Sequence, residues 1–330
     1  MKGLPDPALP LALDEAERVF GEILDGDVAD DDIAQFLIGM TDRSETSDEI
    51  AGAARALRAR LLPVDAPEDA IDCCGTGGDG HHTLNVSTAV SLVVSAAGVP
   101  VAKHGNRAAS SKSGAADTLE VLGLDMAAAG QSAERTLNEI GICFLFAPNH
   151  HPAMGRIQPI RKKLGRRTIF NLMGPLSNPA QVERQLIGIA RPAYVPIYAR
   201  AKAQLGGEHT MIVSGDEGLD ELSLAGGNEL ADVRGADFEM RRVDASAAGL
   251  DHAPVEAIRG GDAAHNAKAL KALLQGTPGP YRDAVLLNAS AALQVAGKAT
   301  GWTDGVAMGA EAIDSGSAEA LLAQWIDLTR

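Results

Sequence analysis

The chain has 330 residues, of which 45% are hydrophobic and 22% charged, and its formal net charge is −15 at pH 7. This composition is typical of a folded globular protein with one large domain or two smaller ones, and it excludes a disordered chain. The acidic excess disfavours a polyanionic partner such as DNA, and an aromatic content of 3% disfavours a stacking platform for single-stranded nucleic acid. Because the three cysteines have no metal-binding spacing and no apolar run reaches membrane-spanning length, we expect a cytoplasmic protein with no nucleic-acid or membrane partner.

The first 70 residues are acidic and have a helical pattern. They contain 17 acidic and 6 basic residues, and their apolar residues recur at helical spacing in successive windows. Thr46 followed by Glu49 predicts a capping box at the start of one of these helices. Since prolines interrupt the pattern in the polar stretch LLPVDAPEDA, we expect a small helical domain over residues 1–66.

From residue 67 onward, short apolar runs alternate with helix-like segments. Helices are expected over 87–97, 113–123, 286–297 and 306–316, and strand-like runs occur at 70–74, 99–103, 142–146, 185–190 and 210–213. Alternation of this kind is typical of βαβ units in a mostly parallel sheet. We therefore expect an α/β domain over residues 67–330.

A run of positive charge interrupts this acidic protein. Between His150 and Val182 there is no acidic residue, and the basic residues are Arg156, Arg161, Lys162, Lys163, Arg166 and Arg167. Such a run is most often a solvated helix face. In an acidic protein it also suits a small anionic ligand, and the glycine-rich segments described next favour that second interpretation.

The run Gly75-Thr76-Gly77-Gly78-Asp79-Gly80 follows the first strand-like segment. It matches G-x-G-x-x-G, the fingerprint of a dinucleotide-binding Rossmann fold. We reject that fold because residues 81–85 separate the last glycine from the next helix, the next strand ends in Lys103-His104 rather than in an acid, and Asp79 would lie beside a pyrophosphate. The glycines still allow backbone N–H groups to converge on one anion, so a phosphate site and a tight turn both remain open.

Two further polar segments suit an anion. Residues 85–88 begin the next helix, where they could cap it or offer hydroxyl and N–H groups to a phosphate or a metal. Residues 103–107 end the second strand and lead into the basic, small-residue stretch 110–114. Because ligands of open α/β sheets bind beyond the carboxyl ends of the strands, we expect these loops to meet there as an anion site.

Eight motifs follow one another along the chain: GTGGDG, TLNVST, KHGNR, SKSGAAD, FAPNHHPAM, RKKLGRRTIFNLMGPLSNP, GLDELS and LLNASAAL. In this order and spacing they resemble the anthranilate phosphoribosyltransferase family of tryptophan biosynthesis. The resemblance covers nearly the whole chain. It implies a nucleoside phosphorylase/phosphoribosyltransferase-like α/β fold, a small helical domain joined in space by part of 150–180, and ligands bound between the two domains. It also implies a homodimer, one or two Mg²⁺ ions per monomer, and transfer of the phosphoribosyl group of phosphoribosyl pyrophosphate to anthranilate, with release of pyrophosphate.

The resemblance also implies site residues. For the metal these are Ser87, Asp220 and Glu221, and for anthranilate they are Gly75, Asn106 and Arg161, with His104 and Pro175 as further candidates. The sequence identifies no general base, and Asp79 or a water could take the proton. For phosphoribosyl pyrophosphate the implied contacts are Gly75, Gly78, Asp79, Thr83, Asn85, Val86, Ser87, Thr88, Lys103, His104, Gly105, Asn106, Arg107, Ala108, Ala109, Ser110, Ser111 and Ala115.

The chain departs from the family pattern at several positions. Ala115 stands where the family usually has serine, Gly155 where lysine is common, and Cys73-Cys74 where an aliphatic pair is usual, while His81-His82 is unusual. Pyrimidine nucleoside phosphorylase, which shares the architecture, and a non-catalytic nucleic-acid-binding relative are the alternatives. The stretch 149–179 with Arg161 favours the anthranilate enzyme.

Overall fold

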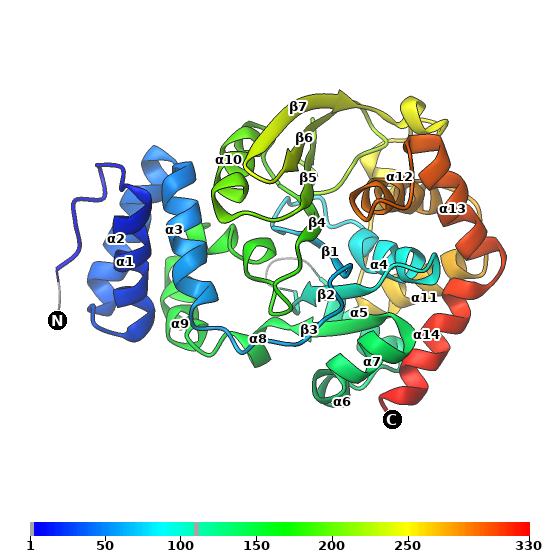
Figure 1. The fold of residues 1–330 in the computed structure, drawn as a ribbon, viewed down its shortest axis with the longest axis horizontal. Coiled ribbons are helices and arrows are strands. Elements are labelled where there is room, and N and C mark those ends of the chain that lie inside the picture. The colour runs from blue at the N-terminus through cyan, green and yellow to red at the C-terminus, as the bar shows by residue number, and fades with distance from the viewer. Residues whose placement is uncertain (1–2, 109–111) are drawn as a thin grey trace.

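The computed structural model describes residues 3–108 and 112–330. Helices α1 (Leu13–Asp25), α2 (Asp30–Arg43) and α3 (Ser47–Arg58) form an N-terminal helix group that lies beside the sheet, at the left of Figure 1. The expected capping box begins α3, because the Glu49 N–H donates to Thr46 Oγ1 over 3.3 Å and the Thr46 N–H donates to Glu49 Oε2 over 2.8 Å. The helical start predicted from periodicity is confirmed.

One seven-stranded sheet forms the centre of the described residues. Its order is β3-β2-β1-β4-β5-β6-β7, in which β1 to β5 run parallel while β6 and β7 form an antiparallel hairpin at one edge. The predicted mostly parallel sheet is confirmed. The strands are β1 (Ile71–Gly75), β2 (Val101–Gly105), β3 (Ile142–Phe146), β4 (Arg184–Gly188), β5 (His209–Gly215), β6 (Asn228–Arg234) and β7 (Asp237–Val243).

The edge hairpin was not expected from the sequence. Strand β7 reads DFEMRRV and is largely exposed, so it has no apolar run by which a strand could be recognised. Its charged side chains suit an edge strand, since charge on an edge discourages pairing with another chain.

Helices cover both faces of the sheet (Figure 1). The expected helices at 87–97, 113–123, 286–297 and 306–316 are α4, α5, α12 and α13. In chain order the helices that follow the first strand are α4 (Val86–Ala96), α5 (Ala115–Leu122), α6 (Met126–Gln131), α7 (Ala133–Ile140), α8 (Ala147–His150), α9 (Met154–Leu164), α10 (Val195–Leu205), α11 (Ala263–Leu274), α12 (Pro280–Val295), α13 (Trp302–Asp314) and α14 (Ser317–Leu328).

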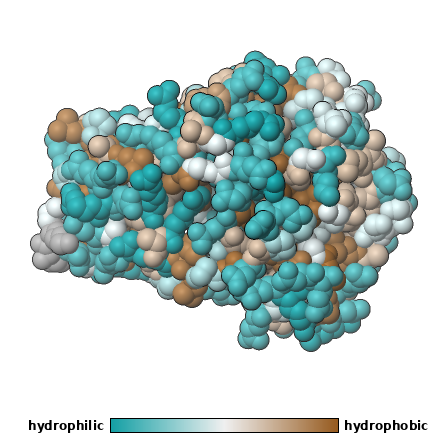
Figure 2. All heavy atoms as spheres, viewed as in Figure 1, coloured by the Kyte–Doolittle hydropathy of each residue, from teal (hydrophilic) through white to brown (hydrophobic). Residues whose placement is uncertain are grey.

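Alternating strand residues divide the hydrophobic core between the two faces. In β5, Met211 and Val213 pack into the core shared with α4 and α11 to α14, while Ile212 packs into the core shared with α10 and the N-terminal helix group. This two-residue period is what a strand buried on both faces requires. Figure 2 shows hydrophilic residues over most of the face it displays, with hydrophobic ones in small separate groups.

The segment after β3 crosses from the sheet to the N-terminal helix group. Ile157 and Ile160 of α9, with Ile169 and Phe170 of the 3₁₀ helix η1 (Ile169–Asn171), belong to the same hydrophobic core as α1 to α3. The rings of Phe20 and Phe170 meet edge to face with centroids 5.8 Å apart. This segment therefore connects the sheet to the helix group through a shared apolar core.

Part of the basic run pairs with the acidic helix group. Arg156 lies 3.1 Å from Asp30, Lys163 lies 3.2 Å from Asp31, and Arg166 lies 2.6 Å from Asp42, in each case between a nitrogen and a carboxylate oxygen. These three side chains thus form surface ion pairs with the helix group, and they are neither a solvated helix face nor part of a ligand site. Each pair contributes about 0–1 kcal/mol to stability.

None of the helices within residues 3–108 and 112–330 combines the length and the apolar character needed to cross a bilayer.

Glu49 offers a test of how the N-terminal helix group is held together. Its carboxylate is fully buried and accepts hydrogen bonds from Arg43, Thr46 and Leu11. Burial opposes ionisation, but the hydrogen bonds from Arg43 and the two backbone N–H groups outweigh it and hold the pKa of Glu49 below 4.5. The stabilisation is therefore present above pH 4.5 and is lost as the pH falls through the lowered pKa.

We expect Glu49→Gln to lower the free energy of unfolding at pH 7 by about 2 kcal/mol, because the change leaves Arg43 without its buried partner. Urea unfolding at pH 7 and at pH 4 would measure the effect, which should shrink at the lower pH. Glu15→Gln is the control, since Glu15 lies in an exposed pair with Arg18 at 3.8 Å. Equal midpoints for wild type and Glu49→Gln at pH 7 would contradict the account.

Candidate active site

The run Gly75–Gly80, called the glycine loop from here on, lies at the end of β1, and β1 lies between β2 and β4 in the sheet. From β1 the chain adds β2 and β3 on one side of the sheet and later β4 and β5 on the other side. The strand order therefore reverses at β1, and open α/β sheets bind ligands in the crevice at such a switch point. The loops after β1 and β2 and the turn after β5 reach this crevice. The expectation that the polar loops share one edge of the sheet is confirmed.

The glycine loop has a backbone that other residues would strain. Gly77, Gly78 and Gly80 have φ values of +69°, +73° and +82°. The Gly77 N–H donates to Asp220 Oδ2 over 2.6 Å. Arg167, which lies between α9 and η1, donates from Nη1 to the carbonyl oxygens of Gly77, at 3.1 Å, and Gly78, at 2.9 Å. The loop is thus held from two sides, by a carboxylate and by a guanidinium.

Asp220 fits closely against the ends of two neighbouring strands. Gly75 of β1 and Gly188 of β4 are paired in register. A Cβ at Gly75 would overlap the carboxylate of Asp220, and a Cβ at Gly188 would overlap the backbone oxygen of Asp220. The two glycines therefore make room for the turn after β5, which brings the Asp220-Glu221 pair to the glycine loop.

The acidic pair is where a cation would fit. Glu221 Oε1 accepts from the Ser87 N–H at the start of α4, at 3.2 Å. Burial raises the pKa of Asp220, and the negative charge of the nearby Asp79 raises it further. Burial also raises the pKa of Glu221, with a smaller contribution from the charge of Asp220. A divalent cation between these carboxylates would relieve both effects.

The donor set suits Mg²⁺ in particular. Two carboxylates and the hydroxyl of Ser87 are hard oxygen ligands, and Mg²⁺ typically binds one or two carboxylates with water and substrate phosphate completing its shell. No group of three or more histidine, cysteine, aspartate or glutamate residues suited to holding a metal occurs within the described residues. With Asp220, Glu221 and Ser87 as protein ligands, water and a substrate phosphate would complete the shell of the ion.

Lys103 and His104 lie near the end of β2, one strand away from β1, and both are buried. Lys103 Nζ donates to the carbonyl oxygen of Cys73 at 2.8 Å and lies 3.4 Å from Ser87 Oγ. Asp72, whose pKa burial raises to about 6, accepts from the His104 N–H over 3.1 Å. These contacts place an ammonium group between the end of β1 and the start of α4.

His104 and His151 form a neutral buried pair. Burial lowers the pKa of His104 to about 3 and that of His151 to about 4, so both rings are uncharged at pH 7. His104 Nδ1 lies 2.9 Å from the carbonyl oxygen of Gly174, and because a carbonyl can only accept, Nδ1 holds the proton. His104 Nε2 then accepts from His151 Nε2, 3.3 Å away. Pro175, next to Gly174, is buried beside them.

The loop after β2 is held by a residue that sequence reasoning missed. Asp117 Oδ2 accepts from the Ala108 N–H at 3.0 Å and from the Gly114 N–H at 2.8 Å, and Asp117 Oδ1 accepts from Arg107 at 3.0 Å. Arg107 also pairs with Glu120, so its side chain lies along α5, which begins at Ala115. Ala109, Ser110 and Ser111 lie outside the described residues. Asn106 is exposed at the start of the loop.

The predicted residues around the start of α4 have scaffold contacts. Asn85 Oδ1 accepts from Thr118 at 2.6 Å and from Asn266 at 2.9 Å, so its side chain ties α4 to α5 and α11 instead of capping α4. Thr83 pairs with Arg259 in an isolated bridge. Val86 and Thr88 are buried. At the start of α4 it is therefore the backbone N–H groups, more than the side chains of Asn85, Val86 and Thr88, that are available to a ligand in the crevice.

Arg161 differs from its basic neighbours on α9. It is partly buried, and burial lowers its pKa. Within the described part of the chain it forms no ion pair with an acidic residue, unlike Arg156, Lys163 and Arg166. A half-buried guanidinium without a carboxylate suits an anionic ligand.

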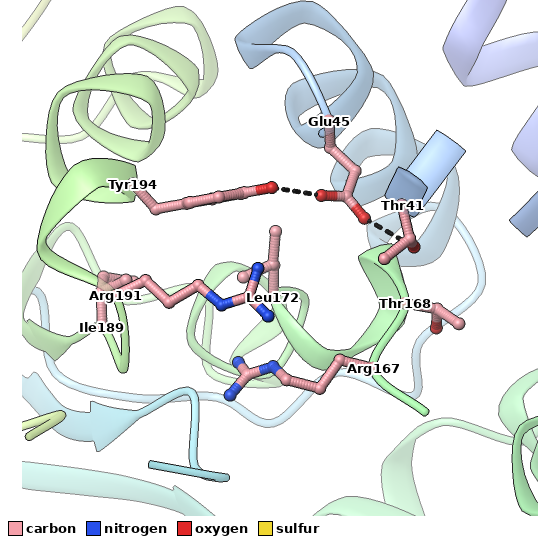
Figure 3. Close-up of a pocket in the computed structure, with 8 residues that line it drawn as sticks. All are labelled: Thr41, Glu45, Arg167, Thr168, Leu172, Ile189, Arg191 and Tyr194. Carbon is pink, nitrogen blue, oxygen red and sulfur yellow. Dashed lines mark hydrogen bonds between the residues drawn. The ribbon is translucent and has the colours of Figure 1, made fainter. Parts of the chain in front are cut away.

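A small pocket lies where the helix group meets the sheet (Figure 3). Glu45, which follows α2, accepts from the hydroxyls of Tyr194 at 2.7 Å and Thr41 at 3.1 Å. The guanidinium groups of Arg167 and Arg191 point into the same space. The sequence placed Arg167 only within the basic run and gave Asp72 no role, because the partners of these two side chains, the Gly77 and Gly78 carbonyls and the His104 N–H, cannot be recognised from a motif.

The chain matches two family descriptions over most of its length. Residues 67–319 match the α/β domain of a glycosyl transferase family, and residues 9–61 match the helical bundle domain of a glycosyl transferase family. An anthranilate phosphoribosyltransferase of Erythrobacter litoralis is 75% identical over 328 residues, which cover 99% of each chain. The chain belongs to the anthranilate phosphoribosyltransferase family. The resemblance found in the sequence motifs is confirmed.

Solved structures of this family share the fold. The anthranilate phosphoribosyltransferase of Thermus thermophilus superposes with a TM-score of 0.92 at 39% identity, over 98% of this chain and 97% of that one. The Saccharomyces cerevisiae enzyme in complex with PRPP and Mg gives a TM-score of 0.87 at 30% identity, over 97% and 93%. The expected fold class, a helical N-terminal part with a mostly parallel α/β part, is confirmed.

The close fit of Asp220 against β4 gives a prediction. We expect Gly188→Ala to lower the free energy of unfolding by about 3 kcal/mol, because the added methyl group overlaps backbone that cannot move without shifting the acidic pair. It should also lower transferase activity at least tenfold.

Gly226→Ala is the matched control, because a Cβ at Gly226 would meet nothing within 4 Å. Thermal unfolding and steady-state assays of both variants would check the prediction. A Gly188→Ala protein as stable and active as Gly226→Ala would show that the turn after β5 does not need this space.

Proposed function

We propose that this chain transfers the phosphoribosyl group of 5-phosphoribosyl 1-pyrophosphate to the amino group of anthranilate, giving N-(5-phosphoribosyl)anthranilate and pyrophosphate. One observation carries the proposal: glycine-loop N–H groups, the Lys103 ammonium and the Asp220-Glu221 pair converge at one sheet edge in a member of this family. A multiply charged phosphate ester with its cation is the ligand that this combination suits.

The donor would lie across the loops after β1 and β2. Its pyrophosphate would take N–H groups of the glycine loop and of residues 85–88, with the charge of Lys103 close by. The remaining donor contacts would come from Gly75, Thr83, residues 104–111 and Ala115. Arg107 would have to leave Asp117 and Glu120 for its side chain to take part, so we assign its contribution to the backbone.

Mg²⁺ would be held by Asp220, Glu221 and Ser87, as one or two ions per monomer. When bound, it supplies positive charge against the charge that builds up on the departing pyrophosphate. The yeast relative whose structure contains PRPP and Mg supports this assignment.

The carboxylates and the donor compete for the same N–H groups. In the structure, Asp220 accepts from Gly77 and Glu221 accepts from Ser87. A carboxylate that turns away from these N–H groups toward a cation leaves them to a phosphate. We therefore expect the donor and the metal to bind better together than separately.

Anthranilate would bind beside α9 and the buried histidine pair. Its carboxylate would meet Arg161, which has the charge and the planar geometry for a bidentate contact. Asn106 and the backbone at Gly75 would lie near the amine, and His104 and Pro175 would line the ring. A structure of the yeast enzyme with 4-fluoroanthranilate supports an aromatic acceptor.

The mechanism rests on positioning and electrostatics. The bond from the sugar carbon to the pyrophosphate oxygen breaks, the aniline nitrogen forms its bond to the same carbon, and that nitrogen then passes a proton to a water or to Asp79. The loop N–H groups and Lys103 stabilise the leaving pyrophosphate. The neutral His104–His151 pair would line the acceptor ring without adding a charge there.

Three finer assignments complete the proposal. We assign residues 1–66 with part of 150–180 to a small domain and 67–330 to the α/β domain, on the basis of the shared core of α9, η1 and α1 to α3. We assign a homodimer and a cytoplasmic location. Free cysteines at Cys73, Cys74 and Cys143 agree with a reducing compartment.

The direct test is the loss of anthranilate fluorescence on mixing the chain with phosphoribosyl pyrophosphate and Mg²⁺. Turnover should require both, and EDTA should abolish it. Uridine with phosphate, the substrate pair of the related phosphorylase, should give no product. Turnover of uridine but not of anthranilate would overturn the proposal.

Arg161 carries the acceptor assignment. We expect Arg161→Met to raise the anthranilate KM about ten- to a hundredfold, the range for a lost hydrogen bond to a charged group, with the donor KM within twofold of wild type. Lys162→Met, the exposed neighbour on α9, should change neither constant. Equal effects of the two variants would remove Arg161 from the acceptor site.

Glu221→Gln separates the two roles of the acidic pair. In Mg²⁺ the donor should bind at least tenfold more weakly than to wild type, because a charged ligand is lost. In EDTA it should bind no more weakly, since one negative charge facing the pyrophosphate is removed. Calorimetry with phosphoribosyl pyrophosphate under both conditions would check this crossover, and equal weakening in both would contradict it.

A further inference from the structure

Arg167 has contacts that the proposed chemistry does not use. It stands between α9 and η1, and its Nη1 donates to the carbonyl oxygens of Gly77 and Gly78. Within the described residues it forms no ion pair with a carboxylate, whereas its neighbour Arg166 pairs with Asp42. A partly buried guanidinium that binds two successive carbonyls of a ligand loop calls for an explanation.

The geometry of the peptide group supplies one. In a trans peptide the carbonyl oxygen of one residue and the N–H of the next point in opposite directions, and the described chain has no cis bond. Because Arg167 holds the oxygens of Gly77 and Gly78 on its own side, the N–H groups of Gly78 and Asp79 face the other side. Neither N–H donates to a protein group in the described part of the chain.

The backbone of the loop agrees with this arrangement. Two successive carbonyls can be turned toward one donor here because Gly77 and Gly78 both have left-handed φ values, +69° and +73°. A Cβ at Gly78 would lie 2.9 Å from Arg167 Nη1, so the glycine also gives the guanidinium room. Successive N–H groups presented in this way form an anion-binding concavity.

Arg167 is itself anchored outside the sheet. The next residue, Thr168, donates from its N–H to Asn171 Oδ1 over 3.0 Å, and Ile169 and Phe170 are buried in the core of the N-terminal helix group. Figure 3 shows the Arg167 side chain extending from this segment into the space that Arg191 also enters. The contact thus joins the helix group to the glycine loop.

We propose that Arg167 is a positioning residue for the donor site. By holding the Gly77 and Gly78 carbonyls, it aims the N–H groups of Gly78 and Asp79 at the pyrophosphate and keeps the carbonyl oxygens away from that anion. This inference rests on the proposed function, because the anion is the pyrophosphate of that reaction. On this proposal Arg167 affects the binding of the donor and of the product pyrophosphate, and it does not affect the binding of anthranilate.

The test compares Arg167→Met and Arg167→Lys with Arg166→Met. Calorimetry with pyrophosphate and Mg²⁺ measures the site without turnover, and steady-state kinetics give separate KM values for the donor and for anthranilate. For Arg167→Met we expect pyrophosphate binding about tenfold weaker, a donor KM raised by a similar factor, and an anthranilate KM within twofold of wild type. Arg167→Lys should fall between, because an ammonium group lacks the planar fork of guanidinium.

Arg166→Met controls for loss of a positive charge from the same segment and should match wild type in both assays. Thermal unfolding shows whether each variant is folded, and if Arg167→Met is not, the intermediate value of Arg167→Lys provides the test. Pyrophosphate binding within twofold of wild type in both Arg167 variants would overturn the role of Arg167. So would equal increases of the two KM values. A wild-type chain that binds no pyrophosphate with Mg²⁺ would overturn the proposed function as well.

Discussion

The close approach of Asp220 to the ends of β1 and β4 is the constraint on which the site depends. Gly75 and Gly188 are neighbours in the sheet register, and neither position has space for a side chain. Because these two glycines have no side chains, the turn after β5 can pack directly against the end of the sheet. This packing brings the carboxylate of Asp220 to the glycine loop and that of Glu221 to the start of α4. Through this contact Asp220 accepts from the Gly77 N–H and Glu221 accepts from the Ser87 N–H.

In the structure, N–H groups that suit a phosphate are bonded to carboxylates instead. Gly77 donates to Asp220 and Ser87 donates to Glu221, while burial raises the pKa of both acids. Such an arrangement gives the exposed Gly77 N–H and the partly buried Ser87 N–H an acceptor when no anion is present. It also places negative charge where the pyrophosphate would lie, so a cation is needed before the two can share the site. Metal dependence would then follow from the protein's own hydrogen bonds as well as from the chemistry of the leaving group.

Much of the fold and the outline of the site could be predicted from the sequence. The alternating apolar runs predicted the parallel strands, the Thr46-Glu49 box predicted the start of α3, and the motif order predicted the family.

Long-range side-chain partners could not be predicted in the same way. The Arg166 and Arg167 side chains are adjacent in sequence, yet one meets Asp42 and the other meets Gly77 and Gly78. Likewise Asn85 suggested a helix cap, but its partners are Thr118 and Asn266, distant in the chain. The edge strand β7 was missed because exposure allows it to be charged.

A crystal structure of this chain with phosphoribosyl pyrophosphate and Mg²⁺ tests the central claim most directly. The account predicts that Asp220 and Glu221 have left the N–H groups of Gly77 and Ser87, that pyrophosphate oxygens accept from the N–H groups at this sheet edge, and that a metal lies between the pyrophosphate and the two carboxylates. A donor bound elsewhere, with both carboxylates still accepting from Gly77 and Ser87, would contradict it.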